Sequence, residues 1–318
     1  MVTGGAGFIG SHVVDLALLR GHEVAVLDDL SSGRSEHVPP GVAFFHCDVR
    51  DQAATLRAFL SFGPDAVAHL AAQASVSVSM RSPLTDATIN VLGGLHVAEA
   101  ARAAGSKTFV FASTGGAIYG DVADGAACET HPPAPISPYA INKLAFEMLL
   151  GTYQAQGHLV PRILRYANVY GPRQNPHGEA GVVAIFLERA QSGAPLLINA
   201  AHALGDDGCT RDYIFVADVA RANLEALEGK LDAPLLNLGT GQGTTTAALA
   251  AQVLTLCPGS KSSLVPAPPR PGDVARSVLD GARYASSNGP YTTLPAGLAV
   301  TAAWHRAQLV STQTPGCS

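Results

Sequence analysis

The stretch VTGGAGFIGSH, residues 2–12, decides the fold of this chain. It holds Gly4, Gly7 and Gly10 at three-residue spacing, and it also fits the pattern GxGxxG. Glycine lets the backbone approach a pyrophosphate closely, and the N-terminus of a following helix offers unpaired N–H groups and a partial positive charge. Apolar residues before Gly4 predict a short strand, and the residues after Gly7 predict a helix. This order of strand, glycine turn and helix predicts a dinucleotide-binding site.

An acidic residue closes the next predicted strand, HEVAVLD. Asp28 stands 18 residues after Gly10, where a carboxylate can accept hydrogen bonds from a ribose diol. Asp29 adds a negative charge that would repel a 2′-phosphate, so we predict NAD as the cofactor rather than NADP. Asp48 ends the third predicted strand, VAFFHCD. We assign Asp48 to the adenine, with a plain role at the strand end as the alternative.

Apolar runs alternate with helical segments through the first half of the chain. Further strand-like runs are DAVAHLAA, KTFVFAS and PRILRYANVYG. The alternation predicts an α/β protein with a Rossmann-like doubly wound parallel sheet. After about Val169, prolines and glycines interrupt the pattern, which predicts a smaller C-terminal substrate lobe over the carboxyl ends of the strands. We expect an NAD-binding domain over residues 1–168 with a strand and helix near 212–240 returning to it, a substrate lobe over 169–211 and 241–304, and a flexible tail over 305–318.

Composition narrows the class of protein. The chain has 318 residues, of which 47% are hydrophobic and 14% charged, so it is a globular chain. Its net charge of −5, without a basic run, argues against nucleic-acid binding. Five cysteines match no zinc pattern, and no uninterrupted apolar segment reaches the ~18 residues of a membrane span. We predict unpaired thiols, no metal, a cytoplasmic location, and structural roles for His12, His69 and His177.

A second motif carries a candidate reactive pair. SPYAINK places Tyr139 and Lys143 four residues apart, on one face of a helix. A phenol titrates near ~10, and a neighbouring ammonium together with a positive nicotinamide ring favours the phenolate. Tyr139 would then serve as a general base near neutral pH. The strand FAST, about 25 residues earlier, adds the hydroxyls of Ser113 and Thr114.

Taken together, these residues resemble the extended short-chain dehydrogenase/reductase family and, within it, the UDP-glucose 4-epimerases. The resemblance runs from Met1 to about Trp304. Its motifs are GxxGxxG from Gly4, DDLSSG from Asp28, HLAAQ from His69, NV from Asn90, YxxxK from Tyr139, RYAN from Arg165, RDY from Arg211 and RPGD from Arg270.

The resemblance implies a role for each matching position. Tyr139 would be the catalytic base, and Lys143 would bind the nicotinamide ribose and lower the pKa of Tyr139. NAD would contact Gly4, Gly7, Phe8, Ile9, Gly10, Asp28, Asp29, Leu30, Ser31, Ser32, Gly33, Asp48, Val49, Leu70, Ala71, Ala72, Gln73, Asn90, Tyr139, Lys143 and Tyr166. The UDP-sugar would contact Thr114, Tyr139, Asn168, Arg211, Arg270, Asp273 and Ser277.

Four of these implied contacts bear on the choice of substrate. The guanidinium groups of Arg211 and Arg270 suit forked contact with a diphosphate, and Asn168 would reach phosphate or uracil. In the family, the position of Ser277 lines the sugar pocket near C2. Its small side chain implies room for an acetamido group, so N-acetylhexosamines are expected among the substrates.

One position departs from the family pattern. Four residues before Tyr119, the family has a Ser or Thr that hydrogen-bonds the sugar 4-hydroxyl, and this chain has Gly115. We assign the role to Thr114, with Ser113 or a water as alternatives, and we expect the Gly115–Gly116 pair to turn the loop differently. Sister dehydratases place Asp-Glu after the Thr, and sister decarboxylases place Glu there. Without such an acid, the remaining chemistry is oxidation and re-reduction at one carbon, which is epimerisation.

We therefore predict an NAD-dependent enzyme that inverts C4 of a UDP-hexose through a 4-keto sugar. One alternative is another nucleotide-sugar epimerase, such as a UDP-glucuronate 4-epimerase. A second is a non-catalytic dinucleotide-sensing protein, a class that typically loses the Tyr or the Lys. The predicted helices around residues 88–104 and 137–154 resemble the pair that forms the family's four-helix dimer interface, so we expect a homodimer.

Overall fold

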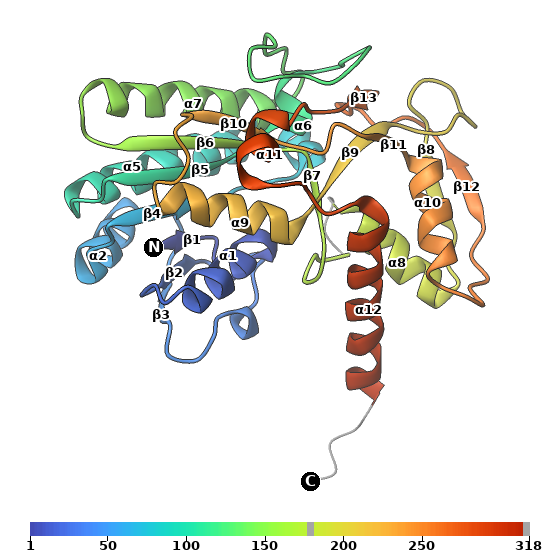
Figure 1. Cartoon of the computed structure of the whole chain (residues 1–318), viewed down its shortest axis with the longest axis horizontal. Coiled ribbons are helices and arrows are strands. Elements are labelled where there is room, and N and C mark those ends of the chain that lie inside the picture. The colour runs from blue at the N-terminus through green and yellow to red at the C-terminus, as the bar shows by residue number, and fades with distance from the viewer. Residues whose placement is uncertain (177–180, 314–318) are drawn as a thin grey trace.

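The computed structural model describes residues 1–176 and 181–313, with side chains as far as residue 308. His177 and residues 314–318, the end of the predicted tail, lie outside them. Figure 1 shows a large sheet with helices on both faces, beside a smaller lobe that carries α8, α10, β8 and β12. The smaller lobe's helices are α8 (Val182–Ser192), α10 (Thr246–Thr255) and α12 (Leu294–Gln313).

Seven parallel strands form the large sheet, in the order β10-β6-β5-β4-β1-β2-β3. The chain runs outward from β1 to β3 on one side and from β4 to β6 on the other, so the order reverses between β1 and β4. Open α/β sheets bind ligands beyond the carboxyl ends of the strands at such a point. The strands are β1 (Val2–Thr3), β2 (Ala25–Asp28), β3 (Ala43–His46), β4 (Ala66–His69), β5 (Thr108–Thr114), β6 (Val160–Tyr166) and β10 (Leu235–Leu238).

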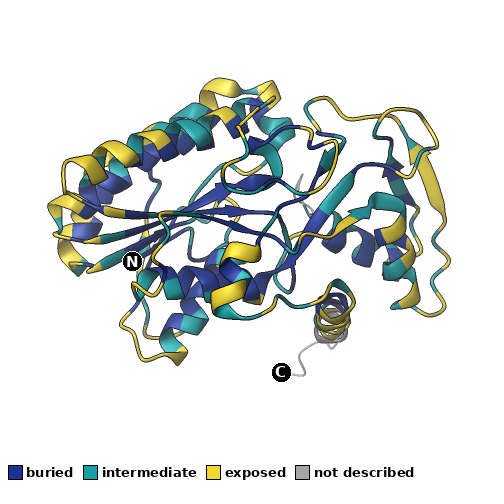
Figure 2. Ribbon diagram, turned by 45° about the horizontal axis from the view of Figure 1, so that its top comes forward, coloured by how far each residue is buried: buried dark blue, intermediate teal, exposed yellow. Residues whose placement is uncertain are grey.

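Helices cover both faces of this sheet (Figure 1). On one face, α1 (Phe8–Leu19) packs against α9 (Val216–Leu227). The other face carries α2 (Gln52–Phe62), α5 (Gly94–Ala103) and α7 (Pro138–Ala155). The strands lie buried between these layers, except for the exposed edge strand β3, and the outer helix faces are exposed (Figure 2). The predicted doubly wound Rossmann-like sheet is confirmed.

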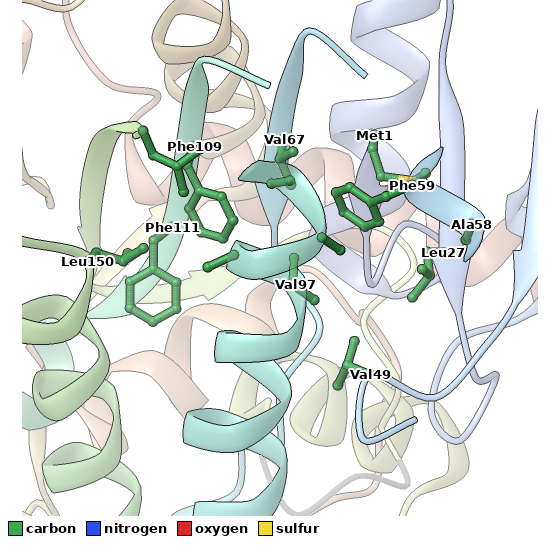
Figure 3. Packing of buried hydrophobic residues seen from close by; sticks show 14 of the residues in the cluster. Met1, Leu27, Val49, Ala58, Phe59, Val67, Val97, Phe109, Phe111 and Leu150 are labelled. Atoms are coloured by element: carbon green, nitrogen blue, oxygen red, sulfur yellow. The ribbon is translucent and has the colours of Figure 1, made fainter. Parts of the chain in front are cut away.

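Aromatic side chains fill the layer between the sheet and the second helix face. Phe59 of α2, Phe109 and Phe111 of β5 and Phe146 of α7 are all buried, and Val97 of α5 packs among them. Figure 3 shows Phe59, Phe109 and Phe111 around Val67 and Val97. Burying one such side chain contributes about 1.5–3 kcal/mol relative to leaving it exposed. This packing fixes α7 against the carboxyl half of β5, where the predicted reactive residues stand.

The smaller lobe has a sheet of its own. Its strands are β7 (Asn168–Tyr170), β9 (Thr210–Phe215), β11 (Gly243–Thr245) and β13 (Arg276–Ser277), and β8 (Leu196–Asn199) pairs separately with β12 (Leu264–Ala267). Within the segment 212–240, only the end of β9 lies in this second sheet. The segment that does return is α9 followed by β10, which pairs with β6.

Residues 305–313, which belong to the predicted flexible tail, continue α12. Leu298, Thr301, Ala302 and His305 are buried at helical spacing, so one face of α12 packs against the rest of the chain as far as His305. In the chain as described, no helix is long and apolar enough to cross a membrane.

Candidate active site

The glycine turn joins β1 to α1 where the strand order reverses. Gly4 has a φ of +70°, and a Cβ on it would lie 2.6 Å from the backbone N of Ala71. A Cβ on Gly10 would lie 2.1 Å from the carbonyl O of Gly4, so both positions require glycine. Gly7 caps α1, and the N–H groups of Phe8 and Ile9 in its first turn lack partners inside the helix. The turn is therefore a backbone cradle suited to a pyrophosphate.

Asp28 ends β2 with a carboxylate that is 6% exposed. It accepts hydrogen bonds from the backbone N–H groups of Ala6 at 3.0 Å and Leu30 at 2.9 Å. Burial raises the pKa of Asp28, and these two hydrogen bonds oppose that rise. A Cβ on Gly33 would lie 2.8 Å from Asp28 Oδ1, so a larger residue would crowd the carboxylate. Asp29 accepts from the backbone N and Oγ of Ser31 at 2.9 and 2.6 Å.

The carboxylate of Asp48 is engaged by Arg50. It accepts from the Arg50 backbone N–H at 2.8 Å, and from the guanidinium at 2.5–3.0 Å. The guanidinium holds the pKa of Asp48 below its usual value. This arrangement favours the plain role at the strand end over the adenine contact. Val49 beside it is buried, and its carbonyl O lies 2.9 Å from His96 Nδ1.

The loop after β4 carries Leu70, Ala71, Ala72 and Gln73, and Asn90 fixes its shape. Asn90 is 2% exposed in a π-helical segment, η2 (Thr88–Gly93). Its Nδ2 donates to the Gln73 carbonyl at 2.9 Å, and its Oδ1 accepts from the Gln73 backbone N–H at 3.1 Å. The amide of Asn90 is therefore used to hold the loop beside the glycine turn, which Ala71 contacts.

Three predicted catalytic residues meet where β5 ends against α7. The Ser137 hydroxyl caps α7 by accepting from the Ala140 backbone N–H at 3.3 Å. Tyr139 follows in the first turn, and its side chain is hydrogen-bonded to Thr114. Lys143, one turn later, donates from Nζ to the Ala112 carbonyl at 2.9 Å. This Nζ also lies 4.8 Å from the centroid of the Phe111 ring, within cation–π range.

The two reactive groups are shifted in opposite directions by burial. Burial raises the pKa of Tyr139 to about 12; the hydrogen bond from Thr114 lowers it and the Asp86 charge raises it. Burial lowers the pKa of Lys143 to about 8, against the raising effect of Asp86 and Glu147. The expectation that Lys143 lowers the pKa of Tyr139 is thus not met by the residues of this chain. The ammonium donates to the Ala112 carbonyl, and desolvation of the phenol dominates.

The Ser113 hydroxyl is hydrogen-bonded to a buried ion pair between Glu147 and Arg165. Its hydroxyl donates to Glu147 Oε1 at 2.5 Å. Glu147 accepts from Arg165 Nε at 3.0 Å and Nη2 at 2.5 Å, and Arg165 Nη1 donates to the Tyr119 hydroxyl at 2.9 Å. All four side chains are buried. Ser113 is thereby committed to this network, which leaves Thr114 as the hydroxyl bonded to Tyr139.

The Gly115–Gly116 pair begins a short helix, α6 (Gly115–Ile118). Neither glycine has a positive φ, so the expectation of a different loop turn is wrong. The reason for glycine is packing: a Cβ on Gly115 would lie 2.3 Å from Leu279 Cδ1. A Ser or Thr at this position would collide with Leu279.

A cavity of about 470 Å³ is lined by residues of both lobes. Tyr166 lines it at the end of β6, while its hydroxyl is bonded to Asn223 at 2.8–2.9 Å. The predicted substrate residues that line this cavity are Thr114, Tyr139, Asn168, Arg211, Arg270 and Asp273.

Ser277 is the exception among the predicted substrate residues. It is buried in β13 opposite Arg211 and is not among the residues described as lining the cavity. Counting from Asp273 located the position, but the pairing of β13 with β9 decides what the side chain meets. The role beside the sugar that the resemblance implies for Ser277 stays a prediction.

Sequence reasoning missed other cavity residues. Gln174, Arg189 and Asn199 line the cavity from the segment after β7, from α8 and from β8. No motif marks these positions, because they come together through the fold of the smaller lobe. Within residues 1–176 and 181–313, no group of three or more His, Cys, Asp or Glu side chains is placed to hold a metal ion.

The glycine cradle, the buried Asp28 and the loop after β4 lie together at the carboxyl ends of β1, β2 and β4, and these groups fit a dinucleotide. The model of the NAD-dependent epimerase/dehydratase family matches residues 1–239. The chain belongs to this family. Its relatives include the UDP-glucose 4-epimerase of Mycolicibacterium smegmatis, 42% identical over 314 residues, which cover 96% of this chain and 98% of that protein.

Solved structures of family members share the whole architecture. The Thermus thermophilus UDP-glucose 4-epimerase, in complex with NAD, superposes with a TM-score of 0.92 at 50% identity, covering 96% of this chain and 98% of that one. The Thermotoga maritima UDP-glucose 4-epimerase, with UDP-glucose, superposes with a TM-score of 0.90 at 44% identity, covering 97% and 98% of the two chains.

Proposed function

We propose that this chain is an NAD-dependent epimerase that inverts C4 of a UDP-hexose and interconverts UDP-glucose and UDP-galactose. The observation that carries the proposal is the Thr114–Tyr139–Lys143 group at the edge of a cavity with two arginines. The relatives that are UDP-glucose 4-epimerases at 42–50% identity over nearly the full chain support the same activity.

The family also contains dehydratases, and the cavity lining favours the epimerase. Among the described residues that line the cavity, Asp273 is the one carboxylate. Directly after Thr114 in the sequence, the lining residues are Gly116 and Ala117, which carry no acid to protonate a leaving hydroxyl. Oxidation and re-reduction at one carbon requires a proton acceptor and a hydride carrier. Tyr139 is the proton acceptor in this proposal.

Each residue of the group has a distinct task in this proposal. The Thr114 hydroxyl orients the sugar 4-hydroxyl and the Tyr139 phenol. Tyr139 takes the hydroxyl proton when C4 is oxidised and returns it when C4 is reduced. NAD, when bound in the glycine cradle with its ribose at Asp28, supplies the chemistry of accepting a hydride from C4 and giving it back. Lys143 remains protonated and would bind the nicotinamide ribose.

The diphosphate requires cationic contacts that hold it while the 4-keto sugar turns over. Arg211 on β9 and Arg270 after β12 both line the cavity. Their forked donor geometry suits phosphate oxygens, and Asn168 at the start of β7 lies beside them in the lining. A diphosphate fixed at this end lets either face of C4 be presented to the reacting groups.

We also propose a homodimer. Leu92 of η2, and Ile141 and Met148 of α7, are 51%, 51% and 71% exposed. Large apolar side chains that gather on one exposed helix pair are typical of a surface covered by another subunit. These residues lie on the two helical segments that the family resemblance assigns to a four-helix interface.

Purified protein incubated separately with UDP-galactose, UDP-N-acetylglucosamine and UDP-glucuronate tests the proposal, with products identified by NMR. Conversion of UDP-galactose to UDP-glucose is the expected result. Turnover of UDP-glucuronate without turnover of UDP-galactose would replace the proposed substrate. Turnover of the N-acetyl sugar would agree with the room for an acetamido group that the small side chain of Ser277 implies.

A further inference from the structure

Asp86 is a buried carboxylate that no sequence motif singles out. It lies in α4 (Pro83–Ala87) with 0% exposure. Its Oδ2 accepts from Gln73 Nε2 at 2.5 Å, and its Oδ1 accepts from Asn142 Nδ2 at 2.7 Å. Gln73 belongs to the loop after β4, and Asn142 directly precedes Lys143 on α7. One carboxylate therefore ties the predicted cofactor loop to the helix that carries the reactive pair.

The charge of Asp86 acts on that pair. Its two recorded hydrogen-bond donors are neutral amides, so these bonds do not neutralise it. Asp86 raises the pKa of Lys143 against the lowering caused by burial, and it also raises the pKa of Tyr139. Lys143 is 3% exposed, and charges interact more strongly in such surroundings than in water.

The other titratable groups around Lys143 have different roles. Glu147, one turn later on α7, also raises the pKa of Lys143, but it is paired with Arg165 of β6 at 2.5 Å. His69 of β4 is neutral at physiological pH, since burial lowers its pKa to about 3. Tyr166 of β6 is also uncharged there, because burial raises its pKa. Asp86 thus differs from Glu147, because its recorded hydrogen-bond donors are the neutral amides of Gln73 and Asn142 and not a cation.

We propose that Asp86 is a positioning residue of the active site. Its carboxylate holds the loop after β4 against α7 and supplies the fixed negative charge that keeps Lys143 protonated. The catalytic consequence rests on the proposed function, because it requires Lys143 to work in its charged form. The effect on the charge of Lys143 does not depend on that function and can be measured in the protein without substrate.

The variant Asp86→Asn removes the charge with little change of shape. If the Asn142 amide turns over, its oxygen accepts from the new amide, so both hydrogen bonds of position 86 are retained. The chain has four lysines, so selective ¹³Cε labelling follows each one by NMR, and Lys143→Arg assigns the resonance. We expect the Lys143 midpoint in the variant to lie lower by roughly half a pH unit or more, with the alkaline limb of turnover shifted in the same direction.

A charge exchange separates this effect from a structural one. In the double variant Asp86→Asn/Asn142→Asp, the amide at position 86 still accepts from Gln73 and donates to the new carboxylate, which stays beside Lys143. We expect the midpoint to return to within a few tenths of the wild-type value. Glu99→Gln, which removes an exposed carboxylate on α5 bonded to Arg102, is the matched control and should leave the midpoint unchanged.

Two results would overturn the inference. One is a Lys143 midpoint that is the same in Asp86→Asn and wild type; the other is a double variant whose midpoint stays lowered. If the single variant does not fold, the double variant decides, because it keeps the charge. A lowered midpoint in Asp86→Asn together with wild-type protein that does not epimerise UDP-galactose would support the inference and refute the proposed function.

Discussion

At the end of β5, three consecutive residues have three different neighbours that decide what each can do. Ser113 donates to Glu147, Thr114 is bonded to Tyr139, and a side chain at Gly115 would meet Leu279. The sequence predicts that this strand delivers hydroxyls to the site. It does not say which hydroxyl is available, because the competing acceptor, Glu147, lies 34 residues away.

Removal of the two hydroxyls should therefore have different effects on turnover and stability. Thr114→Ala is expected to slow turnover by more than roughly tenfold, since the sugar hydroxyl and Tyr139 lose their orienting partner. Ser113→Ala is expected to slow turnover less but to destabilise the fold by about 1–3 kcal/mol, because it removes a buried partner of Glu147. Steady-state kinetics and urea unfolding of both variants measure the two effects. A larger loss of turnover in Ser113→Ala would reverse the assignment.

A substitution at Gly115 tests whether packing against Leu279 explains this glycine. Gly115→Ser restores a hydroxyl at the family's usual position, but its Cβ would press on Leu279. We expect a loss of about 1–3 kcal/mol in the free energy of unfolding, as overpacked cores show. Gly151→Ser, on α7 with nothing within 4 Å of its Cβ, is the control and should cost less. Equal stability of the two variants would remove packing as the reason for this glycine.

Among the elements, α7 presents Tyr139, Lys143 and Glu147 at intervals of one turn toward the end of β5. The helical periodicity of SPYAINK predicts this shared face, because spacing alone determines it. The direction of the pKa shift of Tyr139 was not predictable, since it depends on how far the packing of β5 and α7 removes water. The same limit applies to the surroundings of Ser277, because the pairing of β13 with β9 that decides them is not local.

Because Lys143 titrates, stability and turnover are expected to change with pH in opposite directions. Its folded pKa of about 8 lies below the ordinary value of 10.5, so between these values the unfolded chain binds more protons. Stability therefore rises with pH through this window, by up to about 3 kcal/mol from this group. Turnover is expected to fall above pH 8, because the ammonium is lost.

Comparison with Lys143→Met tests this pair of trends. In urea unfolding, wild type should gain stability relative to the variant as the pH rises from 8 to 10, since the variant has no group that titrates there. Turnover of wild type over the same range should decline. A difference in stability that is independent of pH would contradict a lowered pKa for Lys143.

For the whole molecule, the apolar side chains on η2 and α7 make an assembly prediction. We expect sedimentation to show a dimer at micromolar concentration, because Ile141 and Met148 would be covered by the second subunit. Met148→Lys should shift the equilibrium toward monomer, whereas Leu204→Lys, which changes another exposed leucine (69%) in the smaller lobe, should not. A monomeric wild type at this concentration would refute the proposed interface.

The reactive pair lies at the edge of a cavity that residues of the large sheet and of the smaller lobe line together. The alternation of strands and helices was sufficient to predict the large sheet, because neighbouring parallel strands need a long crossover connection, which is usually a helix. The cavity was predictable only through its motif residues. Gln174, Arg189 and Asn199 line it from a loop, a helix and a strand of the smaller lobe, which long-range packing brings together.

The central claim is that C4 is inverted by removal and return of a hydride, with Tyr139 handling the hydroxyl proton. Incubation of the protein with UDP-galactose in D₂O, followed by NMR of the product, tests it most directly. The account predicts UDP-glucose that carries protium at C4, no net reduction of NAD, and a rate at least ~10² lower in Tyr139→Phe. Deuterium at C4, or failure to form UDP-glucose at all, would contradict it.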